Sequence, residues 1–475
     1  MESNAVTYEN LRLSTYEVEH ITYLSLSKSA NDHASLDVVA ILGEQVADRY
    51  IYTTNELTPI MLSYKSETDE DIVLFKGMVT SLQISKQGGV FYMNLSAKGA
   101  TCIMAIQQKR RSFQNTSMTT HQVIAEVLSQ YENANFIAQI PDLPIGGLLL
   151  QYQETDWAFL KRLVSWYGAT IIPEVRADGI ACFVGVPENN ECQHIDAFRY
   201  RVSKSIESYE IMKNNGWPEV QEIEYVIFTV ENEQIFQIGD NVELDGKSLY
   251  VESAVHVLED GILKNTYALK LKEGFKSLKV YNTTIVGCSL NGTVIGVARD
   301  KLMIDLEIDG AGRAAYWFPY STMSASPDGS GWYCMPEKGD QVRVYFPTKE
   351  EKDAYAISAI SGHEPKAGDS QDPMGDPNIK RLSTIYDKVI LFAEEGILIN
   401  SDSGQASVFL GKNGQITLYG AESVNVTAEK EVAIIAQESV LIGATQSVTL
   451  KNSGASIEIK EDGNITLQGK KVYSN

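Results

Sequence analysis

VNVTAEKEVAIIAQESVLIGATQSVTL, residues 424–450, repeats one pattern every eight residues. Each repeat contains two aliphatic residues separated by one other residue, and the first aliphatic residues are Val424, Val432, Val440 and Val448. A fixed period of this kind is the sequence mark of a repeat architecture. The paired aliphatic residues of this and the neighbouring repeats are Val408, Leu410, Ile416, Leu418, Val424, Val426, Val432, Ile434, Val440, Ile442, Val448, Leu450, Ile457, Ile459, Ile465 and Leu467.

The repeat tolerates two irregularities. One extra residue precedes Ile457, and an insertion of three residues separates these repeats from two earlier triplets, residues 389–391 and 397–399. Each repeat reads as a short strand, whose residues i and i+2 share a face, followed by a turn rich in Gly, Ser, Asn and Asp.

A single chain that turned every eight residues would enclose too little space for Val, Leu and Ile side chains. Three chains wound about one axis enclose a triangular prism, and strands of one chain then pair with those of its neighbours. We therefore expect residues 385–475 to form an intertwined triple-stranded β-helix with the paired aliphatic residues as its trimer core. At ~4.8 Å per strand, this needle would be roughly 50 Å long.

Two other folds stay open for the repeats. Strands of a β-sandwich are usually ~5–6 residues long and their turns are irregularly spaced, which the constant period disfavours. A single-chain parallel β-helix needs more residues per coil than the repeat provides.

The composition limits the possible partners. The chain has 475 residues, 44% of them hydrophobic and 21% charged, which is ordinary for a globular protein. The net charge is −22, and a trimer would carry −66, so nucleic acid is not an expected partner and a membrane would have to be crossed mechanically.

No targeting segment is recognisable. The residues MESNAVTYENLRL lack the basic and apolar regions of a signal peptide, and no stretch approaches 18 apolar residues. Five scattered cysteines without CxxC spacing indicate reduced thiols. We expect synthesis in the cytoplasm, followed by assembly into a particle that acts outside the cell or on a target envelope.

The chain as a whole is expected to be mainly β and to have several domains. Helices are indicated by the capping box Thr119–x–x–Gln122 and by an apolar stripe that begins after Thr155. Gly88-Gly89 indicates a hairpin turn. The expected segments are a first hub β-domain (1–105), a helical insert of the hub (106–168), a second hub β-domain (169–283), a small closed barrel of the OB type (284–362), a linker rich in Pro, Gly and Asp (363–384) and the octad-repeat needle (385–475).

Four motifs in this order carry a family resemblance. They are KGMVTSLQI (76–84), RSFQNTS (111–117), YQETDWAFLKRLVSWYG (152–168) and GWYCMPEKGDQVRVYFP (331–347). Together with the octads they resemble the VgrG family and the central spikes of contractile phage baseplates, over nearly the whole length. Each motif alone is of moderate specificity, whereas the ordered set is strong.

The resemblance implies a homotrimeric hub and spike. Some spikes of this kind carry an enzyme domain between barrel and needle, but residues 363–384 are too few for one, so no enzymatic activity is expected. Such a spike caps a hexameric inner tube, contacts baseplate proteins, and punctures a target envelope when a sheath contracts. It also implies a separate conical PAAR-like tip protein, for which Val472 and Tyr473 are the candidate contacts, and possible effector cargo. The resemblance leaves open whether the system is a type VI secretion apparatus, an extracellular injection particle or a phage-tail-like particle.

The residues themselves indicate no catalytic, cofactor or metal site. No GxSxG, HExxH, P-loop or GxGxxG motif is present. Cys192 and His194 could supply two metal ligands, but no second pair follows. Tyr316, Phe318 and Trp332 belong to an aromatic set that could stack sugars or bases, but the acidic charge favours barrel core and trimer packing. The alternative function is a receptor- or glycan-binding tail fibre or tailspike.

The octad register gives a first testable prediction. We expect Val440→Asp to abolish trimer formation, because threefold symmetry would bring three carboxylates into one dry core layer. Light scattering and thermal melting of the purified variant check this. A variant that kept its trimer and its heat resistance would show that the register is wrong.

Overall fold

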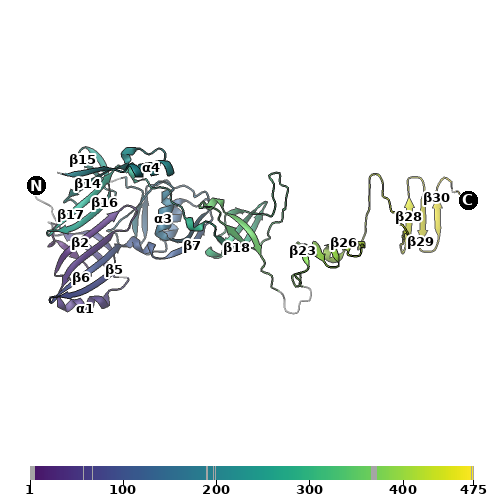
Figure 1. Cartoon of the computed structure of the whole chain (residues 1–475), viewed down its shortest axis with the longest axis horizontal. Helices are drawn as coiled ribbons and strands as arrows, with labels where there is room; N and C mark the ends of the chain where they lie inside the picture. The colour runs from purple at the N-terminus through teal and green to yellow at the C-terminus, as the bar shows by residue number, and fades with distance from the viewer. Residues whose placement is uncertain are drawn as a thin grey trace. The chain divides into compact units, whose positions relative to one another are not determined.

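A computed structural model describes residues 6–56, 58–66, 68–188, 191–195, 197, 199–364, 372–471 and 473 (Figure 1). The chain divides into two compact units, Met1–Gly362 and His363–Asn475. Strands predominate in both units, so the expected mainly β, multidomain fold is confirmed. Within the described ranges, no helix is both long and apolar enough to span a bilayer.

The hub is organised by one twelve-stranded sheet that both expected hub domains share. Its first half contains β1 (Leu11–Leu13), β2 (His20–Ser29), β3 (Ser35–Leu42), β4 (Pro59–Lys65), β5 (Asp71–Gln87) and β6 (Val90–Gly99). Its second half contains β12 (Gln193–His194), β13 (Tyr200–Lys204), β14 (Val226–Asn232), β15 (Asn241–Leu244), β16 (Lys247–Glu259) and β17 (Ile262–Lys270). The halves join where β2 pairs antiparallel with β16, which makes the hub sheet continuous (Figure 1).

Local sequence chemistry explains several hub elements. Gly88 and Gly89 both have positive φ in the β5–β6 turn, so the predicted hairpin is confirmed. The helix α2 (Thr120–Leu128) begins with the predicted capping box of Thr119 and Gln122. The helix α3 (Asp156–Ser165) begins after Thr155, whose side chain accepts a hydrogen bond from Ala158.

Two helices were not foreseen in the strand-rich hub segments. They are α1 (Glu44–Thr53) and α4 (Ile206–Asn215). Each buries only two residues, and α1 has no side-chain cap. Their sequence signal is therefore weak.

Smaller elements complete the hub. The expected insert (106–168) contains β8 (Asn135–Ala138) and the pair of β7 (Gln108–Phe113) and β9 (Leu149–Thr155). β8 forms a sheet with β10 (Ile171–Pro173) and β11 (Ala181–Val184), which lie beyond residue 168. The 3₁₀ helices among the described residues are η1 (Ala100–Ala105), η2 (Glu222–Tyr225), η3 (Lys272–Phe275), η4 (Thr283–Ile285), η5 (Glu307–Asp309), η6 (Glu351–Asp353) and η7 (Asp402–Gly404).

The expected small barrel follows the hub. Its strand order is β20-β19-β18-β21-β22, and a bridge between Tyr320 and Ala356 closes the sheet on itself. Its core includes Phe318 and Phe346, together with Leu150 from β9 of the hub. The strands are β18 (Ser289–Ala298), β19 (Lys301–Leu306), β20 (Trp317–Pro319), β21 (Gln341–Tyr345) and β22 (Tyr355–Ile360).

The second unit contains two antiparallel sheets in which consecutive octads of one chain pair as hairpins. The first contains β23 (Lys380–Ser383), β24 (Val389–Ala393), β25 (Gly396–Ser401), β26 (Ala406–Gly411) and β27 (Ile416–Gly420). The second contains β28 (Ser447–Lys451), β29 (Ser456–Lys460) and β30 (Ile465–Gln468). Residues 421–446 form no strand, and β23 lies inside the segment that was expected to be a linker.

Two buried basic side chains lie at the seam between β2 and β16. Lys28 donates to Gln237 at 3.1 Å, and burial lowers the pKa of Lys28 to about 8. The His256 ring lies 2.8 Å from Asn265, and burial together with the charge of Lys28 lowers the pKa of His256 to about 3. His256 is therefore neutral in the folded hub at neutral pH.

The seam predicts acid sensitivity. An unfolded histidine binds a proton near pH 6.5, so the stabilisation from a neutral buried His256 is complete above that pH and is lost as pH falls toward 3. The pKa difference corresponds to a free energy on the order of 3–5 kcal/mol. We expect His256→Gln to flatten the dependence of the melting temperature on pH between about 7 and about 4. The exposed His20, replaced by Gln, is the matched control, and an unchanged slope in the His256 variant would contradict the assignment.

Candidate functional site

Two groups of residues stand out as candidates for an assembly function. One is a buried polar network, here called the barrel clamp, which joins the hub to the barrel. The other is the octad face, formed by the paired aliphatic residues of the second unit.

Asp156, the first residue of α3, organises the hub side of the barrel clamp. Its side chain is fully buried and accepts hydrogen bonds from Lys109 at 2.6 Å and from Arg111 at 2.5 Å. Tyr131 and Gln151 donate to the same carboxylate at 2.6 and 2.9 Å. Burial alone would raise the pKa of Asp156, but these hydrogen bonds and the charge of Arg111 hold it below its usual value.

Arg162, on the same helix, connects the hub to the barrel. Its side chain is 1% exposed and lies 3.0 Å from Glu154 of the hub and 2.8 Å from Glu351 in η6 of the barrel. It also donates to the carbonyl oxygen of Leu150 at 2.9 Å. Burial raises the pKa of Glu351 and Arg162 opposes this, so the carboxylate depends on the guanidinium to remain charged.

A second bridge lies in the motif RSFQNTS. The backbone N–H and the hydroxyl of Ser112 both donate to Asp309 at 2.5 Å, and Asp309 belongs to η5 of the barrel. Gln114 donates to the carbonyl oxygen of Ile304 at 3.2 Å and accepts from the backbone of Ala315 at 3.2 Å. The motifs at 111–117 and 152–168 therefore hold the barrel against the hub.

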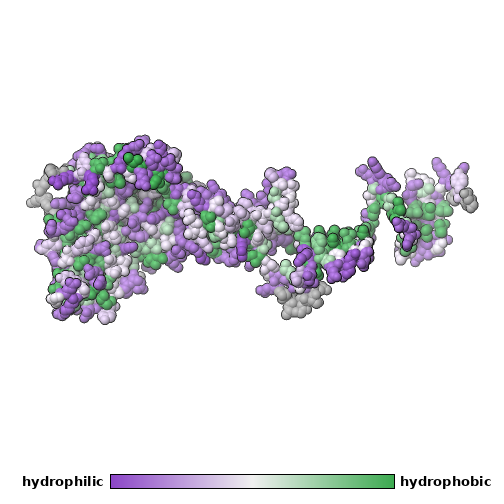
Figure 2. Space-filling model, viewed as in Figure 1, coloured by the Kyte–Doolittle hydropathy of each residue, from purple (hydrophilic) through white to green (hydrophobic). Residues whose placement is uncertain are grey.

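The octad face is unburied in the single chain. Of the sixteen predicted core residues, fourteen are exposed, from 41% at Leu410 to 70% at Ile434, and Val408 and Val448 are half-buried. Figure 2 shows green hydrophobic surface along this unit. Leaving this many aliphatic side chains in water is unfavourable and marks an interaction surface.

The structure brings some predicted core residues together and leaves others apart. Val408, Leu410, Ile416 and Leu418 are cross-strand neighbours on one face of the first sheet. Val448, Leu450, Ile457, Ile459, Ile465 and Leu467 share one face of the second sheet. Between these sheets, no backbone hydrogen bond joins residues 424–442 to any other part of the described chain.

The earliest triplet differs from the sequence expectation. Ile390 and Phe392 of β24 are paired with Ile399 and Ile397 of β25, so these four residues share a face. The triplet that begins at Val389 lies on the opposite face, because a one-residue change of register turns every side chain over. For the tip contact, Val472 lies outside the described residues and Tyr473 is 84% exposed.

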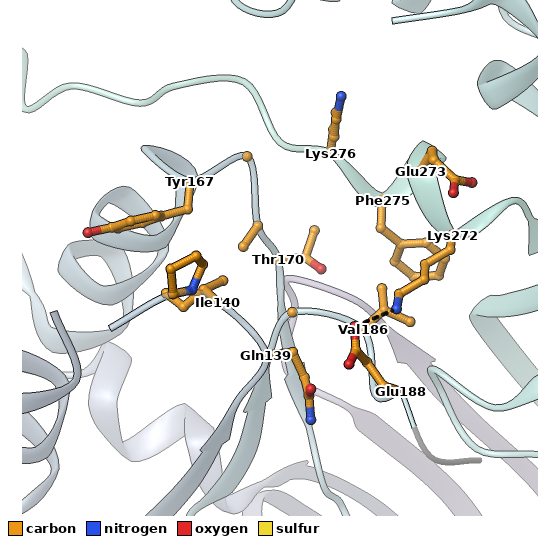
Figure 3. A pocket seen from close by; sticks show the side chains of 14 residues that line it. Gln139, Ile140, Tyr167, Thr170, Val186, Glu188, Lys272, Glu273, Phe275 and Lys276 are labelled. Atoms are coloured by element: carbon orange, nitrogen blue, oxygen red, sulfur yellow. Dashed lines mark hydrogen bonds and ion pairs between the residues drawn. The ribbon is translucent and has the colours of Figure 1, made fainter. Parts of the chain in front are cut away.

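No arrangement typical of an active site was found in the described part of the chain. It contains no cluster of three or more His, Cys, Asp or Glu side chains that could hold a metal ion. A pocket of about 420 Å³ lies between the insert and η3, lined by Tyr167, Thr170 and Phe275 (Figure 3). Its Lys272 is paired with Glu188 at 3.1 Å, so this pocket offers no unpaired charge at that position.

Comparisons with known proteins agree with this arrangement. Residues 30–195 match the family model of the phage tail baseplate hub (GPD). The Escherichia coli c3393 protein, described as a type VI secretion component similar to the phage T4 tail proteins gp27 and gp5, superposes with a TM-score of 0.55 at 10% identity, covering 74% of this chain and 99% of that one. The chain has a VgrG-like hub-and-spike fold.

A second solved structure supports the same fold. A chain of the Francisella PdpA–VgrG complex in its half-lidded form superposes with a TM-score of 0.54 at 10% identity, over 87% of each chain. A search of the curated proteins returned no match. The VgrG-like resemblance read from the four motifs is thereby confirmed.

Sequence reasoning identified the clamp motifs but missed their role. The available signal was a charged residue, Arg162, within the apolar stripe of α3. Its partner Glu351 is 189 residues away, and nothing local to either residue indicates the pairing.

The barrel clamp predicts that removing a buried ion pair lowers the free energy of unfolding much more than removing an exposed one. Arg162→Met leaves Glu154 and Glu351 buried without their cation, so we expect it to lower the free energy of unfolding by about 3–5 kcal/mol. Arg313 and Glu126 form an exposed pair, 2.8 Å apart, between the barrel and the hub. The matched control Arg313→Met should cost less than about 1 kcal/mol. Urea denaturation of the full chain measures the free energy of unfolding of both variants. Equal losses would contradict a larger structural contribution from the buried ion pair.

Proposed function

We propose that this chain is the trimeric central spike and hub of a contractile injection system, which caps the inner tube and mechanically punctures a target envelope. The baseplate-hub match over residues 30–195 and the VgrG-like fold support the hub assignment. The exposed octad face supports the assignment of residues 385–475 as the needle. Type VI secretion, an extracellular injection particle and a phage-tail-like particle share this role.

The exposed octad face is the observation that carries the proposal. Burying an aliphatic side chain stabilises by roughly 1.5–3 kcal/mol, and sixteen such residues per chain are available. In the single chain, the central octads (residues 424–442) make no backbone hydrogen bond to any other part of the described chain. Their paired aliphatic side chains are exposed. Two further copies would supply both at once, and the product would be a stiff rod.

The barrel clamp fits the mechanical role. A spike that is driven forward must transmit force from the hub to the barrel without bending at the joint. The clamp provides buried ionic contacts through Arg162 and a multiple hydrogen bond through Ser112, in addition to shared apolar core. Charge-assisted hydrogen bonds have strict geometry, so the joint resists rotation.

The proposal names several partners. The hub would contact a hexameric inner tube protein and baseplate proteins, and the needle would carry a separate conical tip protein near Tyr473. The PdpA–VgrG complexes are complexes of a VgrG protein with PdpA, which supports cargo as a further partner of this chain. The role requires no catalysis.

Electron microscopy of purified particles tests this function. An antibody against the hub should label one end of the inner tube, and quantitative mass spectrometry should find three copies of the chain per particle. Labelling distributed along the tube, or particles without the chain, would contradict the proposal. Particles from cells lacking the gene serve as the negative control.

A further inference from the structure

A hairpin projects from the barrel between β20 and β21. We call residues 321–335 the barrel arm. The arm is shaped by its own backbone, because Ala325 bridges Gly331 and Trp332 donates to the carbonyl oxygen of Ser324 at 2.8 Å. Gly331 has φ +131°, and a Cβ there would lie 2.4 Å from the oxygen of Ser324. The arm is therefore a preformed hairpin (Figure 1).

The barrel arm exposes three large apolar side chains. Met323 is 88% exposed, Tyr333 is 73% exposed and Trp332 is 48% exposed. The hydroxyl of Tyr333 donates to the carbonyl oxygen of Arg299 at 2.9 Å, which ties the arm to the β18–β19 turn. None of the three belongs to the barrel core. An ordered hairpin that holds aromatic side chains in water is typical of an interaction surface.

The same barrel has an apolar outer patch, here called the barrel platform. Ile295 lies at a bulge in β18 and is 40% exposed. Trp317, 36% exposed, is the strand partner of Met303 and lies over Gly296, where an added Cβ would come within 3.3 Å of the indole ring. The platform therefore consists of Ile295, Met303 and Trp317.

The arm and two of the three platform residues, Ile295 and Trp317, lie in segments that are almost free of charge. Met303 lies in β19 between Lys301 and Asp305, which carry one charge of each sign. Residues 280–298 contain no Asp, Glu, Lys or Arg, and residues 314–336 contain only Asp328. Each copy of the chain has a net charge of −22, so copies repel one another except where their surfaces are neutral. A nearly uncharged arm and a platform whose flanking charges, Lys301 and Asp305, cancel are suited to contact between identical acidic chains.

We propose that the barrel arm of one chain packs on the barrel platform of the next chain and forms an intersubunit clasp. The proposal rests on the trimer of the proposed function. An arm and a platform are different surfaces, so the contact is heterologous and closes into a ring under threefold symmetry. Three such contacts bury Trp332 and Tyr333 of every arm.

Chain connectivity favours the clasp. Only residues 361–379 separate β22 from β23, and this segment reaches at most about 70 Å when fully extended. Trimerisation through the octads would thus confine three barrels to a small volume. The effective concentration of one barrel near the next then reaches about the millimolar range, at which even a weak contact forms.

Photo-crosslinking of the full chain tests the clasp. Tyr333 is replaced by p-benzoylphenylalanine, the protein is irradiated, and the products are boiled in detergent and separated by mass. We expect species of two and three chain masses, and in these species adducts that join Tyr333 of one chain to residues 289–306 or 314–319 of another. An adduct to Arg299 within one chain carries no information, because the two residues are already in contact there. The same replacement at Tyr52, which is 87% exposed in α1, is the control and should give no adduct in these segments.

A platform variant sharpens the test. Ile295→Arg places a charge in the contact and should reduce the intermolecular product at least about fivefold, because a charge buried without a partner is unfavourable. Ile106→Arg in the hub, where the side chain is 76% exposed, is the matched control and should leave the yield unchanged.

The outcomes separate the clasp from the trimer. A protein with trimeric mass whose adducts fall only within the same chain would overturn the clasp and leave the needle intact. Adducts on a different protein in whole particles would also overturn it. A protein with monomeric mass would overturn the clasp and the proposed function together.

Discussion

The structure depends on one constraint: the octad side chains cannot be buried by the chain that carries them. A turn every eight residues leaves too little enclosed volume, and the single chain accordingly pairs its octads as open hairpins or leaves them unpaired. The high exposed fractions of the octad side chains measure how much apolar surface the single chain leaves in water. Association of identical chains is the simplest way to remove this surface from water.

In the first unit, the main structural feature is the rigid connection between the two hub halves and the barrel. Its hub halves share one sheet, and its barrel is held by the buried contacts of Arg162 and Ser112. Buried ion pairs contribute little net stability, but they require a specific geometry and penalise any arrangement that separates the partners. A joint of this kind suits a part that transmits force, and the proposed clasp would extend the same stiffness from one chain to the next.

Much of this arrangement could be predicted from the sequence because the decisive signals are local. The octad period, the capping box at Thr119 and the strand-rich barrel each depend on residues close together in the chain. The pairing of β2 with β16 and the contact of Arg162 with Glu351 depend on segments that are far apart, so no local pattern shows them. The helix α1 escaped notice because it buries little and lacks a cap. The sequence pattern assigned Val389 and Leu391 to the octad face, and this prediction was wrong. Both faces of that strand are apolar, so the pattern does not distinguish them.

The mass of the full chain in solution tests the central claim most directly. Multi-angle light scattering, run at several protein concentrations, should return three times the chain mass of 52.6 kDa, because the proposed trimer is what buries the octad face. A well-folded protein that stayed at the mass of one chain across that range would contradict the account.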